Sequence, residues 1–286
     1  MYLEKQGTFG WLLSVEAFLS GAGGGSFLFG FFYSLLGKYE EIAKTGMLVG
    51  ISLVIIGAVL LYIELGNKKR FYRVVVNPSS WVARGAWFIT IFSVFAVIYL
   101  YSVYRDYSNI DSIAVKTTGL IAAVFAIFVM SYSGFLLAAA KRIPLWNVSG
   151  LPMLFFFSSL CTGNAVILVI SASLDTPMTG APRLMVFTQV IIIFLQMIAL
   201  GTFLGTASYG GTTVSESVHL LIRDPLFVTL AIVLGLLIPL GLLAYQALMN
   251  SASILIVPAG ILLLVGGHYL RHGILRAGIR LPVSIP

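Results

Sequence analysis

Ionisable side chains stand inside long apolar stretches of this sequence, where such residue types are rare. Glu16 lies within the first apolar run, Glu64 ends the second, and Tyr132 lies near the end of the fourth. A carboxylate inside a membrane costs several kcal/mol, at least about 2.5 on insertion scales, and by default marks a functional site or pathway. Carboxylate and phenol groups at one depth are suited to binding the polar edge of a flat, amphipathic molecule.

The composition indicates that the elements carrying these residues lie in lipid. Of 286 residues, 59% are apolar or aromatic and 9% are charged, and the mean hydropathy is +1.02. A soluble domain carries about 25% charged residues. A water-soluble fold of this size has too little interior to hide so much apolar surface. We therefore expect an integral membrane protein that contacts lipid and has no nucleic-acid partner.

Eight runs are long enough to cross a bilayer, which takes about 20 mostly apolar residues. They are apolar on every face, unlike the alternating strands of an outer-membrane barrel. We therefore predict an all-α integral membrane protein with eight transmembrane helices. The expected spans are 10–36, 45–64, 84–104, 115–140, 150–173, 184–207, 225–248 and 253–270. An even number of spans places both termini on one side, which we call side A.

Most of the Lys and Arg residues fall in the loops and tails of side A. The positive-inside rule places that side, with both termini, in the cytoplasm. A basic docking face for an acidic partner subunit would produce the same bias. The candidate docking residues are Lys68, Lys69, Arg70, Arg73, Lys141 and Arg142.

The direction of each helix brings polar residues of the first four spans to side A. Glu16 lies about two turns into span 1, Glu64 ends span 2, Trp87 is near the start of span 3, and Tyr132 is near the end of span 4. These residues predict a pocket that binds one ligand by hydrogen bonds. Other interpretations stay open: Trp87 suits the aromatic belt at a membrane interface. Glu64 is close enough to a span end to reach water, and Tyr132 is able to bond a neighbouring carbonyl.

Span 1 also contains the small-residue run 20–26, Ser-Gly-Ala-Gly-Gly-Gly-Ser. Its spacing fits the small-xxx-small pattern that lets membrane helices approach closely. The glycines beyond one packing face either let a ligand ring approach the backbone or serve a second helix neighbour. We include Ser20 and Gly24 of this run in the candidate pocket.

Metal and haem ligands are scarce in this chain. Cys161 is the only cysteine, which excludes an internal disulfide and a thiolate-bound cluster. His219 falls in a loop, and His268 and His272 lie together at the end of span 8, a position typical of a basic interfacial face. We expect neither haem nor metal in this chain.

Four stretches, in order, resemble the NrfD-type, or polysulfide reductase membrane-subunit, family. They are Phe18-Leu19-Ser20-Gly21 with Gly24-Gly25; Glu64-Leu65-Gly66 with Arg70-Phe71, Asn77-Pro78-Ser79-Ser80 and Gly85-Ala86-Trp87; Tyr132-Ser133-Gly134-Phe135-Leu136-Leu137 with Pro144-Leu145-Trp146; and Gly266-Gly267 with Arg271 and Gly278. Two features depart from the family pattern. Asn67-Lys68 replaces an Arg-Pro pair, and span 1 lacks a histidine, for which Glu16 is a substitute.

The resemblance implies two four-helix bundles in a prokaryotic cytoplasmic membrane, here residues 1–140 with a quinone site and 141–286 with a basic C-terminal tail. It implies a quinone-reactive anchor beneath a four-cluster ferredoxin-like iron–sulfur subunit, usually with a molybdopterin catalytic subunit beyond it. Such an anchor does not turn over the terminal substrate on its own. By the same resemblance, Tyr132 hydrogen-bonds a quinone carbonyl and Glu64 transfers protons, together with Glu16. Menaquinone or ubiquinone is then the exchangeable cofactor.

A secondary transporter is the main alternative. Pro239 and Pro258 interrupt the last two spans, and Asn164, Gln189 and Gln196 lie within spans 5 and 6. Transporters often pair broken helices near the middle of the membrane, but no repeat between the halves accompanies these residues. We interpret them as kinks and interhelix hydrogen bonds, which membrane helices tolerate. A purely structural anchor is a third possibility, and it would leave Glu16 and Glu64 without a role.

Overall fold

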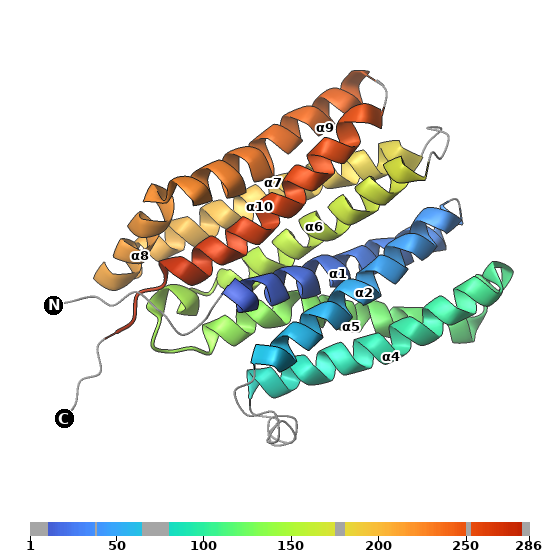
Figure 1. Cartoon of the computed structure of the whole chain (residues 1–286), viewed down its shortest axis with the longest axis horizontal. Coiled ribbons are helices and arrows are strands. Elements are labelled where there is room, and N and C mark those ends of the chain that lie inside the picture. Colours follow the sequence, from blue (N-terminus) through green and yellow to red (C-terminus); the bar gives the residue numbers. More distant parts are fainter. Residues whose placement is uncertain (1–10, 38, 65–79, 175–180, 250–252, 282–286) are drawn as a thin grey trace.

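The protein forms a set of long helices that run side by side, as the computed structural model shows (Figure 1). The structure describes residues 11–37, 39–64, 80–174, 181–249 and 253–281. The longer helices are α1 (Trp11–Leu35), α2 (Glu40–Glu64), α4 (Trp81–Arg105), α5 (Ile113–Ala138), α6 (Leu151–Ser173), α7 (Ala181–Ser208), α8 (Thr212–Arg223), α9 (Ile238–Met249) and α10 (Ile256–Ala277). Short 3₁₀ helices are η2 (Tyr107–Asp111), η3 (Pro144–Asn147) and η5 (Ser253–Leu255), and η4 (Phe227–Leu237) is a π-helix that leads into α9.

Seven helical segments in the described part of the chain are long and apolar enough to cross a membrane. They are Trp11–Leu35, Glu40–Ile63, Trp81–Arg105, Ile113–Ala138, Leu151–Ser173, Arg183–Ser208 and Phe227–Leu248. The eighth expected span, 253–270, falls largely in α10, which is not among the seven. The C-terminal half of α10 carries His268, Arg271, His272 and Arg276, and these residues lower its hydropathy. The all-helical class is thus confirmed for the described residues, and the eighth span stays a prediction.

Helix α1 occupies the centre of the molecule and packs against α2, α5, α6 and α10 (Figure 1). Its glycines allow these close approaches. A Cβ on Gly25 would lie 2.4 Å from the carbonyl oxygen of Ser159 on α6, and one on Gly23 would lie 2.5 Å from the carbonyl oxygen of Gly50 on α2. Carbon atoms normally stay about 3.5–4.0 Å apart. The glycine run therefore serves more than one helix neighbour.

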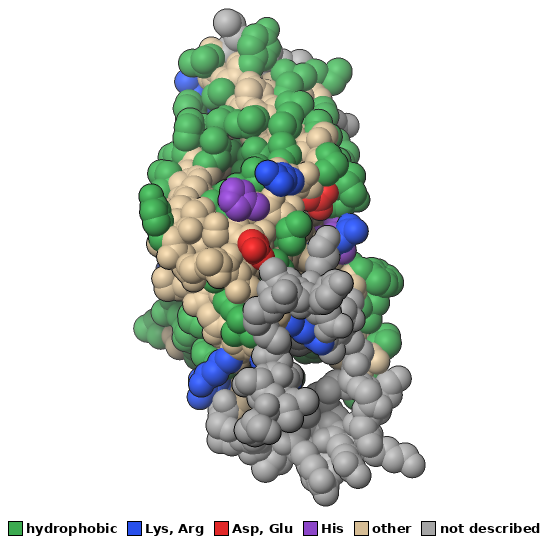
Figure 2. Space-filling view, turned by 90° about the vertical axis from the view of Figure 1, so that its left-hand side faces the viewer, with side chains coloured by type: hydrophobic (Ala, Val, Ile, Leu, Met, Phe, Trp, Pro, Cys, Tyr) green, Lys and Arg blue, Asp and Glu red, His purple; other side chains and the backbone are tan. Residues whose placement is uncertain are grey.

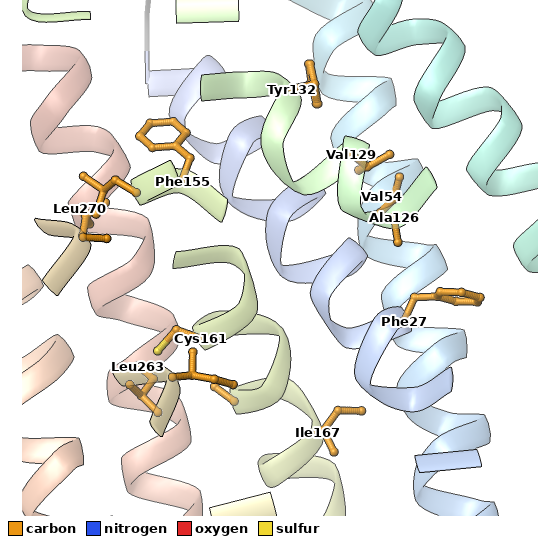
Figure 3. Close-up of a cluster of buried hydrophobic side chains, with 14 of the residues drawn as sticks. Phe27, Val54, Ala126, Val129, Tyr132, Phe155, Cys161, Ile167, Leu263 and Leu270 are labelled. Carbon is orange, nitrogen blue, oxygen red and sulfur yellow. The ribbon is translucent and has the colours of Figure 1, made fainter. Parts of the chain in front are cut away.

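Buried apolar side chains form one continuous cluster across the molecule. Figure 3 shows part of it, with Val54 on α2, Ala126 on α5 and Phe27 on α1 at one side of the view and Cys161 on α6 and Leu263 on α10 at the other. The expected boundary between residues 140 and 141 falls in the short connection between α5 and η3. The two halves of the chain share one core at that boundary, and the division into two bundles stays a prediction.

One end of the molecule gathers the segments that the sequence assigns to side A. Helix α1 begins there, α10 ends there, and the short helix α8 lies there as well (Figure 1). Helix α8 buries Val214, Val218 and Leu221 against its neighbours. In the space-filling view of this end, charged and histidine side chains stand among apolar and neutral ones (Figure 2). This is the end of the molecule at which the candidate site lies.

Candidate functional site

Three of the predicted site residues meet in the interior between α1 and α5. The Tyr132 hydroxyl donates a hydrogen bond to Oε1 of Glu16, and the Ser20 hydroxyl donates to the same oxygen at 2.9 Å. Glu16 is 0% exposed and Tyr132 and Ser20 are each 1% exposed. Ser20 follows Glu16 by four residues, which places both side chains on one face of α1. The arrangement is a buried carboxylate that holds two hydroxyl donors.

The phenol of Tyr132 fits here because α4 presents a glycine to its ring. A Cβ on Gly85 would lie 2.6 Å from Cδ2 and 2.8 Å from Cε2 of Tyr132. The glycine therefore lets the ring lie against the backbone of α4, with its hydroxyl directed to Glu16. Gly85 belongs to the Gly85-Ala86-Trp87 stretch, so two of the sequence motifs meet in this contact.

The remaining predicted ligand-contacting residues differ in their placement. Gly24 packs against α5, since a Cβ there would lie 3.0 Å from Cγ of Met130. Trp87 is 49% exposed and lies outside the buried cluster. The assignment of both residues to a ligand pocket stays a prediction.

The proton-transfer and docking residues lie partly outside the described residues. Helix α2 ends at Glu64, whose side chain is outside them, as are Lys68, Lys69, Arg70 and Arg73. Lys141 and Arg142 are exposed in the connection between α5 and η3, where the backbone carbonyl of Arg142 accepts a hydrogen bond from Leu281. Their exposure at side A leaves both side chains accessible to a partner.

Arg271 belongs to the fourth stretch that resembles the family, but the sequence did not predict its burial near the site. The charge pattern counts it among the basic residues of the side A tail, but the structure buries it completely in α10. Its guanidinium donates to Ser158 Oγ at 3.0 Å and to Ser159 Oγ at 2.9 Å, both on α6. The guanidinium lies against Gly21 of α1, where a Cβ would lie 2.7 Å from Nη2 of Arg271.

No group of three His, Cys, Asp or Glu side chains suited to a metal ion occurs within the described ranges. His268 and His272 stack on each other with ring centroids 6.0 Å apart, and Nδ1 of His272 lies 3.2 Å from Ser14 Oγ. The two histidines thus link α10 to the start of α1.

Two of the three polar residues that raised the transporter alternative, Asn164 and Gln189, are joined by hydrogen bonds between helices. The Asn164 side chain donates to Gln189 Oε1 at 2.9 Å and accepts from the Tyr33 hydroxyl at 3.1 Å. The Gln189 amide in turn donates to the backbone carbonyl of Cys161 at 3.2 Å. These contacts tie α1, α6 and α7 together, as interhelix bonds in a membrane protein do.

Comparison with known proteins identifies the family. The family model for "Polysulphide reductase, NrfD" matches residues 3–282. The chain belongs to this family. It is 26% identical over 187 residues to Protein NrfD of Escherichia coli (strain K12), covering 57% of this chain and 59% of that protein. It is 25% identical over 228 residues to one subunit of the polysulfide reductase of Wolinella succinogenes, covering 71% of each protein. The match to Protein NrfD thus spans less than two thirds of that protein's length.

The family resemblance predicted from the four stretches is therefore confirmed, and the structure gives several motif residues a packing role. A Cβ on Gly134 would lie 2.6 Å from Cα of Pro152, where α5 meets the start of α6. The indole of Trp146 is fully buried, and its nitrogen donates to the carbonyl of Ile274 at 3.2 Å. In this NrfD-family protein, the tyrosine and tryptophan motifs thus fix α5, η3 and α10 around the site.

Proposed function

We propose that this NrfD-family chain is the quinone-reactive membrane subunit of a respiratory oxidoreductase complex. The observation that carries the proposal is the buried carboxylate of Glu16 with the hydroxyls of Tyr132 and Ser20 donating to it. A fully buried acid is expensive in a membrane protein and calls for a function. The family membership makes proton-coupled exchange with a membrane quinone the function that best fits these groups.

The chemistry requires hydrogen-bonding groups and a proton acceptor at one place. A quinone takes up two electrons and two protons when it becomes a quinol, and releases both when it is oxidised again. When a quinone binds, the Tyr132 hydroxyl turns its one O–H donor from Glu16 to a carbonyl oxygen of menaquinone or ubiquinone. Glu16 accepts or returns a proton, and Glu64 is the second acid on the route to the membrane surface. The electrons pass to or from a partner subunit, since this chain is expected to hold no redox metal.

Entry of the quinone requires a local opening of the helices. The described residues bury Tyr132 and Glu16 almost completely, and Gly85 of α4 lies directly against the Tyr132 ring. A headgroup that approaches the phenol from the side of α4 therefore meets that helix first. Trp87, half exposed and two residues beyond Gly85, is placed to contact it on the way.

In the proposed complex, the chain lies in the cytoplasmic membrane of a prokaryote and crosses it eight times. Helix α10 is the eighth span, because it packs against α1, α6 and η4 as a member of the same set of helices. The spans form two four-helix bundles, residues 1–140 and 141–286. Both termini lie on side A, which the excess of basic residues assigns to the cytoplasm.

A four-cluster ferredoxin-like iron–sulfur subunit, and with it a molybdopterin catalytic subunit, is the proposed partner. The docking residues are the basic ones at side A: Lys68, Lys69, Arg70, Arg73, Lys141 and Arg142. A cluster of like charges steers an oppositely charged partner and sets its orientation.

The test is the substitution Tyr132→Phe in the complex purified from its native host. The variant keeps the ring against Gly85 and removes only the hydroxyl. A hydrogen bond to a charged or reacting group contributes about 1.5–3 kcal/mol, so we expect oxidation of a soluble quinol analogue to slow by roughly 10-fold to 100-fold. The iron–sulfur subunit should still co-purify in full amount.

Tyr101→Phe is the matched control, because Tyr101 is a phenol on α4 that is 64% exposed. It should leave quinol oxidation unchanged. If Tyr132→Phe also oxidises quinol at the original rate, the phenol is not part of the site. A chain that purifies without any iron–sulfur subunit would instead favour a transporter or a purely structural anchor.

A further inference from the structure

Two side chains of opposite charge are completely buried in the described part of the chain. Glu16 on α1 and Arg271 on α10 are both 0% exposed, and the third buried charge, Lys44, forms an ion pair with Glu40. A lone charge in a low-dielectric interior is strongly destabilising, whereas an opposite charge nearby recovers much of that cost. The interior beside the site thus holds one acid and one base.

The hydrogen-bond partners of the Arg271 guanidinium are neutral groups. Its Nη1 donates to Ser158 Oγ and, at 2.9 Å, to the carbonyl of Gly267. The ring of Phe155 lies 5.6 Å from its guanidinium carbon. Its Nε has no hydrogen-bond partner among the described residues. A guanidinium does not deprotonate in proteins, so its charge must be balanced by a group that is close but not in direct contact.

Glu16 is the buried carboxylate on α1, the helix against which the guanidinium of Arg271 lies. The guanidinium reaches α1 at Gly21, the residue after Ser20, whose hydroxyl is bonded to Glu16. The other titratable groups near Arg271 are Cys161 on α6 and His268 on its own helix. Neither supplies a negative charge as readily as a carboxylate.

The hydrogen bonds of Glu16 fit an ionised carboxylate. Two hydroxyls, those of Tyr132 and Ser20, donate to the same oxygen, Oε1. An ionised carboxylate only accepts hydrogen bonds, and each of its oxygens can accept two. These two hydrogen bonds are compatible with an ionised carboxylate, and a positive charge on Arg271 favours that state.

We propose that Arg271 is the counter-charge that keeps Glu16 ionised, and so ready to accept a proton. Arg271 is then a positioning residue that acts through Glu16. The proposal rests on the proposed quinone function for its purpose, but the charge state of Glu16 is measurable without any quinone turnover.

The experiment is infrared difference spectroscopy on the purified complex, comparing the original protein with Arg271→Gln. Loss of the guanidinium should leave Glu16 protonated, so a carbonyl stretch of one protonated carboxyl group should appear. That band should be absent from the double variant Glu16→Gln/Arg271→Gln. Arg271→Lys keeps a positive charge and should show no new band. A band in Arg271→Gln but not in Arg271→Lys therefore reports the loss of charge and not damage to the fold.

Arg276→Gln is the matched control, because it removes an exposed arginine from the same helix five residues later. It should leave the carboxyl spectrum unchanged. Thermal unfolding adds an independent readout: the double variant should unfold at a higher temperature than Arg271→Gln alone, since it no longer buries an acid without its counter-charge.

Two results would overturn the proposal. One is a protonated-carboxyl band in the original protein that disappears in Glu16→Gln, which would show that Glu16 is neutral beside Arg271. The other is an Arg271→Gln spectrum without a new band. A wrong quinone function would give a different result. Tyr132→Phe would then leave quinol oxidation unchanged, while the carboxyl bands of the Arg271 variants would still appear as described above.

Discussion

The substitution Gly85→Ala tests whether the close contact between α4 and the Tyr132 ring holds the site together. The added Cβ would lie 2.6 Å from Cδ2 of Tyr132, about 1 Å short of an ordinary carbon–carbon contact. Alanine is otherwise the better helix former, by about 1 kcal/mol. Any loss of stability therefore comes from the clash with the ring.

The structure gives the size of the expected effect. The contact involves ring carbons that are fully buried, so the phenol has little room to withdraw. Overpacking of a dense interior by one methyl group typically costs about 1–3 kcal/mol. A displaced ring also carries its hydroxyl away from Glu16, so we expect quinol oxidation to fall together with the unfolding temperature.

The buried thiol of Cys161 provides the assay. It is the chain's only cysteine and is 1% exposed, so a thiol-reactive fluorophore added to the detergent-solubilised chain should react as the protein unfolds. Gly205→Ala is the control, because nothing lies within 4 Å of a Cβ at that position of α7. It should hold or raise the unfolding temperature. Equal behaviour of the two variants would refute the inference that Gly85 positions Tyr132.

Two further substitutions address the interhelix bonds and the docking face. Asn164→Leu breaks the link to Gln189 and should lower the free energy of unfolding by about 1–2 kcal/mol, measured by the same thiol assay; an unchanged unfolding temperature would contradict a structural role. Reversing the charge of Lys141 and Arg142 to Glu together should reduce the amount of iron–sulfur subunit retained by the immobilised chain, most strongly at low salt. Arg183→Glu, at the opposite end of the molecule, should not reduce it, and equal retention by all variants would remove these residues from the docking face.

Much of the fold was predictable because a membrane span has a strong signature. Apolar runs of about 20 residues are visible without any knowledge of packing, and seven of the expected spans correspond to membrane-length helices. Helix α8 was not predicted, because a search for spans does not detect 12 residues with one apolar face. Arg271 is one of the polar residues that lower the hydropathy of α10, and its side chain is buried. A hydropathy pattern does not reveal such burial.

The sequence predicted at which end of the helices the candidate site residues lie. Helix direction places Glu16 and Tyr132 near side A, and the structure brings their side chains into contact with each other. The sequence did not predict which other candidate residues join that contact, because this depends on which helices face each other. The sequence offered Trp87 and Ser20 as equivalent candidates, yet Ser20 is buried beside Glu16 and Trp87 is half exposed.

Helix α1 both holds the buried acid and packs closely against α6, because its residues face two different neighbouring helices. Glu16 and Ser20 face Tyr132 of α5, whereas Gly21 and Gly25 face Ser159 of α6. A helix with larger residues at the glycine positions would stand farther from α6, and the guanidinium of α10 would lose its place against the backbone of α1. The chemistry of the buried acid thus depends on residues that have no polar side chains, which explains why the polar residues alone gave an incomplete description of the site.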